Sequence, residues 1–298
     1  MRSFIGAVAI CLLFSHQSHA NVLAASDSSG IDKKRLGIVL VGTGVAYGVS
    51  LAALSQAWYT NRGTSFHFFN DNSEWNQVDK AGHFYSAYQL SRVGNELFLW
   101  TNMSEKKSAI WGSVMSQAFM VTIDIFDGFS DEYGFSWGDI SANLLGSGLF
   151  LSQELLFKEQ KIKVKYSFHF TEYAAMRPEL LGSTPMEEIL KDYNGHTYWL
   201  SFDVYSIFNK SPIIPKWLNL AVGYGAEGMV YGHEYENNAN GYQSYRQFYL
   251  ALDPDLSYIR TRSKLLKSLL FFADMIHIPA PTLEYNSQEG FMYHWFYF

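Results

Sequence analysis

The sequence predicts an α+β protein in which a Gly-rich N-terminal helical bundle is followed by an antiparallel β region. Apolar residues recur at helical spacing through the first half of the chain. From Lys161 the spacing changes to the two-residue alternation of a strand, as in KIKVKYSFHF over 161–170, which predicts one wet face. Aromatic and charged residues each make up 17% of the chain, a composition that is apolar for a soluble domain and suggests contact with lipid.

The first twenty residues, 1–20, have the composition of a secretion signal. Arg2 precedes an apolar run from Phe4 to Phe14, and small residues at 18–20 fit a cleavage site. Cys11 lies inside this run, so we expect it to be removed with the signal, leaving a mature chain without disulfides, thiolate metal sites or a cysteine nucleophile. The alternative is an uncleaved interfacial anchor. A polar linker, 21–35, follows.

The helical region, 36–160, begins with a nearly uncharged run over 36–58 that is long enough to span a membrane. Small residues recur every four positions in two stripes that would let another helix approach closely: Gly44, Gly48 and Ala52, and Gly42, Ala46 and Ser50. Two interpretations remain open, a membrane-inserted helix and a buried helix of a bundle. Further helices are predicted at 79–100, 106–126 and 136–157, the last begun by a capping box at Ser136 and Asp139.

The β region, 161–298, is predicted to contain an amphipathic helix over 262–276 and strands near 161–170, 196–205, 217–231, 245–259, 282–285 and 291–298. The aromatic last strand, ending on Phe298, is similar to the terminal strand of a Gram-negative outer-membrane barrel, although a periplasmic sheet would read similarly. Six strands are fewer than the eight of the smallest bacterial barrels. The sequence therefore predicts a small or incomplete outer-membrane barrel, or a curved sheet.

Ionisable residues in the helical region are few and grouped. The candidates for catalysis are Asp79 and His83, four apart on one helix face, and Asp124 and Asp127, three apart on another. The remaining members of the candidate polar cluster are Lys80, Glu96, Glu132, Asp139 and Asn143. Burying such polar groups in an apolar bundle costs free energy unless they are paired with one another or bind a ligand. We therefore expect that they form a binding or catalytic site.

Two roles fit this cluster. In a functional role, His83 carries a proton and the Asp pair acts as a base or holds a divalent cation. In a structural role the same residues form a hydrogen-bonded lock, with Lys80 paired to an aspartate. The common metal-binding, phosphate-binding and nucleophile motifs are absent from the sequence, so we predict no metal and identify no cofactor.

Several segments resemble the envelope family described as predicted periplasmic lipoproteins, domain of unknown function 2279. They are Asp79-Lys80-x-x-His83-Phe84, Glu96, Asp127-Gly128-Phe129-Ser130, Glu132, and Phe135-Ser136-Trp137-Gly138-Asp139-x-x-Ala142-Asn143-x-x-Gly146. Segments at 66–71, 192–195 and 217–229 also resemble its longer Gram-negative members. The resemblance implies an envelope location and no established activity, and Cys11 departs from the lipoprotein pattern. A fainter similarity to VanZ-like membrane proteins points to Asp79, Lys80, His83, Glu96, Asp139, Asn143 and Gly146.

The expected function is based on the predicted location in the cell envelope more than on any catalytic motif. With a net charge of -6 the chain lacks the basic footprint that binding to nucleic acid requires. We expect a non-enzymatic component of the outer membrane, or alternatively of the periplasm, whose partners are membrane lipid or envelope proteins. The competing hypothesis is a hydrolase or transferase that acts on lipid-linked or phosphorylated envelope substrates through the Asp/His cluster. A pure channel is a third hypothesis. The oligomeric state is not fixed by the sequence.

Overall fold

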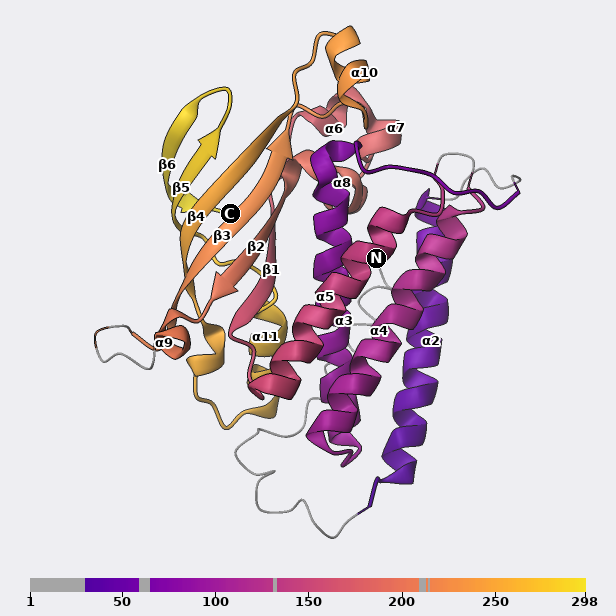
Figure 1. Ribbon diagram of the computed structural model, residues 1–298, viewed down its shortest axis with the longest axis vertical. Helices are drawn as coiled ribbons and strands as arrows, with labels where there is room; N and C mark the ends of the chain where they lie inside the picture. Colours follow the sequence, from indigo (N-terminus) through magenta and orange to yellow (C-terminus); the bar gives the residue numbers. More distant parts are fainter. Residues whose placement is uncertain (1–29, 59–64, 131–132, 209–212, 214) are drawn as a thin grey trace. The chain divides into compact units, whose positions relative to one another are not determined.

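The computed structural model describes residues 30–58, 65–130, 133–208, 213 and 215–298, without the side chains of 53–58. Contacts divide the chain into two compact units (Figure 1). The helical unit contains the chain up to Asn70, Ser86–Glu159 and Thr261–Leu270, and the sheet unit contains Asp71–Tyr85, Gln160–Arg260 and Phe271–Phe298. The expected signal over 1–20 and most of the expected linker lie outside the described residues.

The long helices confirm the predicted helical half. They are α2 (Lys33–Trp58), α3 (Val78–Trp100), α4 (Glu105–Asp127) and α5 (Trp137–Leu156). Helix α2 begins at Lys33, inside the expected linker. The predicted cap of α5 is present, since the Ser136 hydroxyl accepts hydrogen bonds from the backbone N–H groups of Gly138 and Asp139.

Helices α4 and α5 bury mostly small and polar side chains, together with Met120 and Phe150, and expose many of their other large apolar ones. The buried stripe of α5 contains Asp139, Asn143, Ser147 and Gln153, whereas Leu145 is 65% exposed. In α4 the buried stripe includes Ser108, Gly112, Ser113, Ser116 and Asp124, and the exposed face carries Trp111 and Val114. This distribution is the reverse of that in a water-soluble bundle.

Close helix packing occurs at a different place from the one predicted. A Cβ atom added at Gly112 of α4 would lie 2.5 Å from the backbone nitrogen of Asn95 and 2.7 Å from the Ser91 carbonyl oxygen, both on α3. By contrast, nothing described lies within 4 Å of a Cβ built at Gly42, Gly44 or Gly48. Among the described residues, the glycines of α2 therefore make no close approach to another helix, whereas Gly112 at the α3–α4 crossing does.

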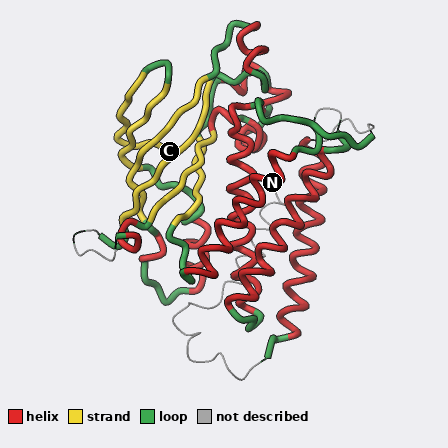
Figure 2. The backbone as a smooth tube through the Cα atoms, viewed as in Figure 1, coloured by secondary structure: helices red, strands yellow, loops and turns green. Residues whose placement is uncertain are grey.

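The β region forms one six-stranded antiparallel sheet with the strand order β1-β2-β3-β4-β5-β6 (Figure 2). The strands are β1 (Ile162–Phe168), β2 (His196–Phe202), β3 (Leu218–Glu227), β4 (Tyr245–Pro254), β5 (Ala280–Asn286) and β6 (Gly290–Tyr297). The sheet is open, which confirms the predicted incomplete or curved form. The sheet curls strongly, as shown by the contact of Tyr297 on β6 with Thr197 on β2, at 3.3 Å between hydroxyl oxygens.

Short helices and turns join the strands. They are η2 (Trp75–Gln77), α6 (Tyr173–Met176), α7 (Pro178–Leu181), α8 (Pro185–Lys191), η3 (Tyr193–Gly195), α9 (Val204–Ile207), α10 (Glu234–Ala239), η4 (Leu256–Tyr258) and α11 (Lys264–Ala273). Helix α11 confirms the predicted amphipathic helix at 262–276. The chain after α11 lies along the free edge of β1. Tyr166 N donates a hydrogen bond to the Met275 carbonyl oxygen, and His277 N donates one to the Tyr166 carbonyl oxygen.

The outer face of the sheet is apolar. Paired residues form rows across the strands, one from Leu200 through Val222, Leu250 and Leu283 to Tyr293, and a second from Tyr224 through Phe248 and Tyr285 to Phe291. From β3 to β6 these side chains are exposed apart from the half-buried Tyr224, with Phe248 at 50% and Phe291 at 73%. Near Tyr198 the first turns of α3 cover this face, through Tyr85 and Gly82.

The inner face of the sheet is buried and combines polar side chains with a hydrophobic core cluster of Trp199, Ala221, Tyr249 and Ala251. One row runs from Ser201 through Ala221, Ala251 and Thr282 to His294, and the next from Trp199 through Gly223 and Tyr249 to Glu284. Gly223 makes room for the indole of Trp199, since a Cβ there would lie 2.7 Å from the ring.

The polar face of β1 is therefore buried and not wet. The alternation over 161–170 was expected to expose its lysines, but Lys163 is 7% exposed and Lys165 0%. The alternation predicted the strand correctly and its wet face wrongly. Val164 on the apolar face is also buried, at 1% exposed, and aspartates from elsewhere in the sheet unit neutralise both lysines.

Candidate functional site

Two of the predicted site residues, Asp79 and Lys80, meet a third charged residue at the start of α3. The Lys80 ammonium nitrogen lies 2.6 Å from Asp71 Oδ2 and 2.8 Å from Asp79 Oδ2. All three side chains are only 12–13% exposed. This ion-paired triad matches the structural role predicted for Lys80, in which an aspartate neutralises it.

A left-handed turn over 75–77 lies between Asp71 and Asp79 and brings these two residues of the triad together. Trp75, Asn76 and Gln77 are consecutive non-glycine residues with φ of 48°, 49° and 63°. Left-handed backbone costs an L-residue roughly 1–2 kcal/mol, so surrounding contacts must hold it. They do: Trp75 N donates to the Gly232 carbonyl oxygen at 2.8 Å, Gln77 Oε1 accepts from Arg246 Nη2 at 2.7 Å, and the Tyr224 hydroxyl donates to the Asn76 carbonyl oxygen.

Glu74 and His233 extend the cluster. Glu74 Oε1 lies 3.3 Å from His233 Nε2, and the two residues form a backbone bridge. Burial raises the pKa of the Glu74 carboxyl, with nearby Asp71 and Asp79 acting in the same direction and His233 and Lys80 opposing them. The sheet unit thus gathers three carboxylates around one lysine beside an imidazole, an arrangement that can hold or transfer a proton.

The remaining predicted residues are divided between the units. His83 lies one turn after Asp79 on α3, within the sheet unit, and is partly buried. Asp124, Asp127, Glu96, Asp139 and Asn143 belong to the helical unit, and Glu132 lies outside the described residues. Within the helical unit, Asn143 Nδ2 donates to Asp124 Oδ2 at 2.8 Å. The enzymatic hypothesis requires His83 to act with Asp124 or Asp127, and it stays a prediction.

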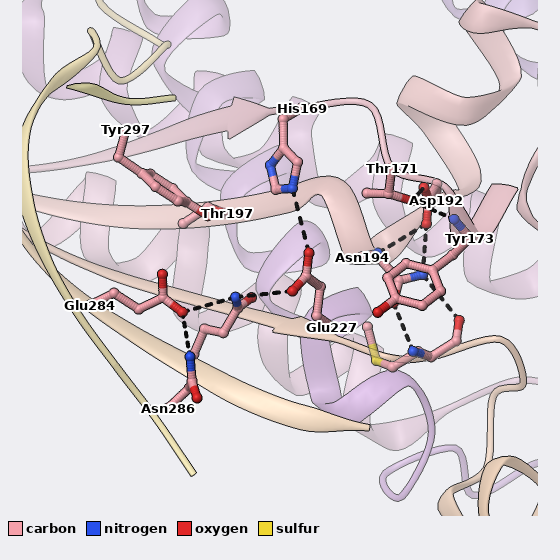
Figure 3. Close-up of polar contacts among 12 residues, drawn as sticks. His169, Thr171, Tyr173, Asp192, Asn194, Thr197, Glu227, Glu284, Asn286 and Tyr297 are labelled. Carbon is pink, nitrogen blue, oxygen red and sulfur yellow. Dashed lines mark hydrogen bonds and ion pairs between the residues drawn. The ribbon is translucent and has the colours of Figure 1, made fainter. Parts of the chain in front are cut away.

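The sequence reasoning missed a second polar cluster on the inner face of the sheet, shown in Figure 3. Gln247 Nε2 bridges the carboxylates of Glu284 and Glu227, at 3.0 and 3.4 Å. Each carboxylate also faces an imidazole, with Glu284 Oε2 2.8 Å from His294 Nε2 and Glu227 Oε1 3.8 Å from His169 Nε2.

Beside this cluster, a hydrogen-bonded hub ties two loops together (Figure 3). Asp192 accepts hydrogen bonds from the Thr171 hydroxyl at 2.5 Å and from Asn194 Nδ2 at 2.8 Å. Asn194 in turn accepts from the backbone N–H of Met229 at 2.8 Å. The hub holds the loop after β3 against the loop before β2 and is structural in character.

A third cluster lies deeper on the inner face and consists of fully buried ion pairs. Lys165 Nζ lies 2.6 Å from Asp253 Oδ2, whose other oxygen is 3.1 Å from His277 Nδ1. Lys163 Nζ lies 2.6 Å from Asp255 Oδ1 and 3.1 Å from Asp274 Oδ2. His277 also stacks on Trp199 at 3.9 Å between ring centroids. These pairs fasten β1 to β4 and to the segment after α11.

The sequence contained a signal for these inner residues, namely the alternation of β1, β4 and β5. Asp253, Glu284 and Gln247 occupy every second position between apolar residues, as Lys163 and Lys165 do. Alternation gives one polar face but does not say whether water or a second set of charges covers it. The long separation of the partners in sequence, 111 residues for Lys163 and Asp274, hid the pairing.

The comparisons with known proteins give one match. No curated protein and no solved structure is similar enough to match the chain. A family model matches residues 67–153. This segment contains Asp71, Asp79, Lys80 and His83 of the sheet unit and the buried polar stripes of α4 and α5. It ends before β1, so the segments at 192–195 and 217–229 lie beyond it. Residues 67–153 match the family described as Predicted periplasmic lipoprotein (DUF2279), which supports a location in the cell envelope.

Proposed function

We propose that the protein is a non-enzymatic component of the outer membrane that contacts lipid through the outer face of its sheet. The observation that carries the proposal is the reversed polarity of the sheet. The charged residues Lys163, Lys165 and Asp253 of its inner face are buried, while its apolar rows from β3 to β6 are exposed. Exposing such rows to water forfeits roughly 25 cal/mol per Å² of apolar surface, and hydrocarbon removes this penalty.

The sheet has the composition of a lipid-facing strand layer. Apolar and polar residues alternate with a period of two, the aromatic side chains are concentrated in β6, and the polar residues face inward. Strands β3 and β4 contain 10 residues each, and a tilted strand needs roughly 9–11 to cross a bilayer.

The helical unit, taken by itself, points in the same direction. Two of its helices include a stretch long and apolar enough to cross a bilayer, Lys33–Ala52 of α2 and Glu105–Asp127 of α4. Length and composition alone also fit the core helix of a soluble protein. A core helix would be mostly buried, however, and only 33% of the α4 window is. Buried serine, glycine and asparagine are also what helices use to pack within lipid.

An arginine scan of the outer face tests the proposal. We expect Leu250→Arg, in the middle of β4, to lower the free energy of unfolding in lipid vesicles by about 2–4 kcal/mol, because the charge would be placed in hydrocarbon. The matched control is Met186→Arg on α8, where the parent residue is similarly exposed, at 45% against 42%. We expect the control to change the free energy by at most about 0.5 kcal/mol.

Two outcomes contradict the proposal. If Leu250→Arg destabilises the protein no more than Met186→Arg does, water and not lipid covers the outer face. If density-gradient fractionation of the parent protein recovers it with the inner membrane, the assignment to the outer membrane is wrong.

A further inference from the structure

The segment from Leu256 to Ala273 is the most basic stretch of an acidic chain. It carries Arg260, Arg262, Lys264 and Lys267 and no acidic residue, although the whole chain has a net charge of -6. Asp255 and Asp274 bound the segment and face Lys163 inside the sheet unit. Its positive charge is therefore concentrated between two anchored ends.

Helix α11, within this segment, exposes three leucines, whereas Leu270, Phe271 and Phe272 are half-buried. Leu265, Leu266 and Leu269 share one side of the helix and are 61%, 41% and 47% exposed. Ser268, on the opposite side, is 1% exposed and donates its hydroxyl to the Lys264 carbonyl oxygen. Tyr258 and Ile259, just before the helix, are also exposed. A helix that buries serine and exposes three leucines lacks the covering of a soluble protein's surface helix.

We infer that this segment lies on an anionic lipid surface, with the leucines of α11 inserted among acyl chains and with Arg262 and Lys267 on lipid phosphates. The inference deepens the proposed function, on which it rests, by naming the class of lipid and the element that recognises it. A basic helix with a leucine face has the composition of interfacial helices that lie in the plane of a membrane.

Charge and exposure together favour lipid over the other occupants. A second copy of the chain would bring two segments of the same sign against each other, which is repulsive. A bilayer containing anionic lipid provides hydrocarbon to cover the leucines and phosphate groups to bind the basic residues. Each basic residue near such a surface contributes about 1 kcal/mol.

A fluorescent label on α11 tests the inference in the full-length chain. An environment-sensitive dye is attached at Leu266→Cys in a Cys11→Ser background, and the protein is reconstituted into bilayers of phosphatidylcholine with or without phosphatidylglycerol. We expect the dye to be quenched by lipid-borne spin labels near the headgroups when phosphatidylglycerol is present, and by an aqueous quencher when it is absent.

The charge dependence has a matched control. Adding Arg262→Gln and Lys267→Gln removes two positive charges, and the ratio of inserted to uninserted dye should fall about 30-fold at about 1 kcal/mol per charge. Lys106→Gln with Lys107→Gln, two exposed lysines of α4, removes the same charge and should leave the ratio unchanged. Circular dichroism verifies that each variant folds.

Three results would overturn the inference. The first is equal insertion in both bilayers, which removes the selection for anionic lipid. The second is access of the aqueous quencher in both. The third is shielding of the dye by energy transfer between copies without lipid quenching, which assigns the face to self-association. None of them depends on Leu250, so the proposed role of the sheet is tested separately.

Discussion

At the scale of single residues, the inner face of the sheet depends on charges that have no access to water. Lys165 and Asp253 are each 0% exposed and lie 2.6 Å apart, and Asp253 also accepts from the Ser201 hydroxyl at 2.5 Å. Removing one member of such a pair leaves the other buried and uncompensated, which typically costs more than the pair contributes.

We therefore expect Lys165→Met to lower the free energy of unfolding by about 3–5 kcal/mol, measured by denaturant titration. The control is Lys158→Met, because Lys158 forms a 3.5 Å ion pair with Glu105 at 75% side-chain exposure. An exposed pair contributes at most about 1 kcal/mol. Equal losses for the two variants would mean that water reaches the inner face.

The sequence predicted part of this residue-level picture. Asp79 and Lys80 were singled out because charges within an apolar helix need partners, and Lys80 does pair with Asp79 and Asp71. Asp71 and Glu74 were missed because the loop containing them has no period from which a shared face could be deduced. His233 was missed because its position beside Glu74 depends on the left-handed turn at 75–77. That turn contains no glycine, so its residue types do not predict a left-handed backbone.

At the scale of elements, the contact between α3 and α4 depends on glycine. Gly94 and Gly112 lie so close that a Cβ at Gly94 would come within 2.7 Å of the Gly112 Cα. Backbone atoms cannot move aside as a side chain can, so an added methyl group must push the helices apart.

Gly112→Ala should accordingly lower the free energy of unfolding by about 1–3 kcal/mol. Gly148→Ala, on α5, is its counterpart, because nothing described lies within 4 Å of the added Cβ. There alanine should raise the stability by up to about 1 kcal/mol through its helix propensity. Thermal unfolding of both variants measures the difference, and a stabilising Gly112→Ala would refute close packing at this crossing.

The positions of the helices and strands could be predicted from the sequence, but which of their faces is buried could not. Periodicity located the four long helices, the six strands and the amphipathic helix, since each period depends only on neighbouring residues. The short helices α6 to α10 were not predicted, because four to seven residues are too few to show a period. Which faces of α5 or β1 are buried depends on residues distant in sequence, and in β1 the lysine face that was expected to be wet is buried.

At the scale of the whole molecule, the same reversal recurs in both units. The sheet unit buries lysine, aspartate and glutamate beside a core that contains Trp199, and it exposes leucine, phenylalanine, Trp217 and Trp295. The helical unit buries serine, asparagine and aspartate and exposes leucine and valine. The proposed contact with lipid would account for both distributions, and the high aromatic content of the chain is consistent with it.

The most direct test of this reversal is the accessibility of successive residues along β4. Single cysteines at 247–252 in a Cys11→Ser background, each carrying a small fluorophore, are exposed in vesicles to a lipid-borne quencher and to a water-soluble one. The account predicts a period of two, with Phe248, Leu250 and Leu252 quenched from the lipid and Gln247, Tyr249 and Ala251 protected from it. Quenching of positions 248, 250 and 252 by the water-soluble agent alone would contradict it.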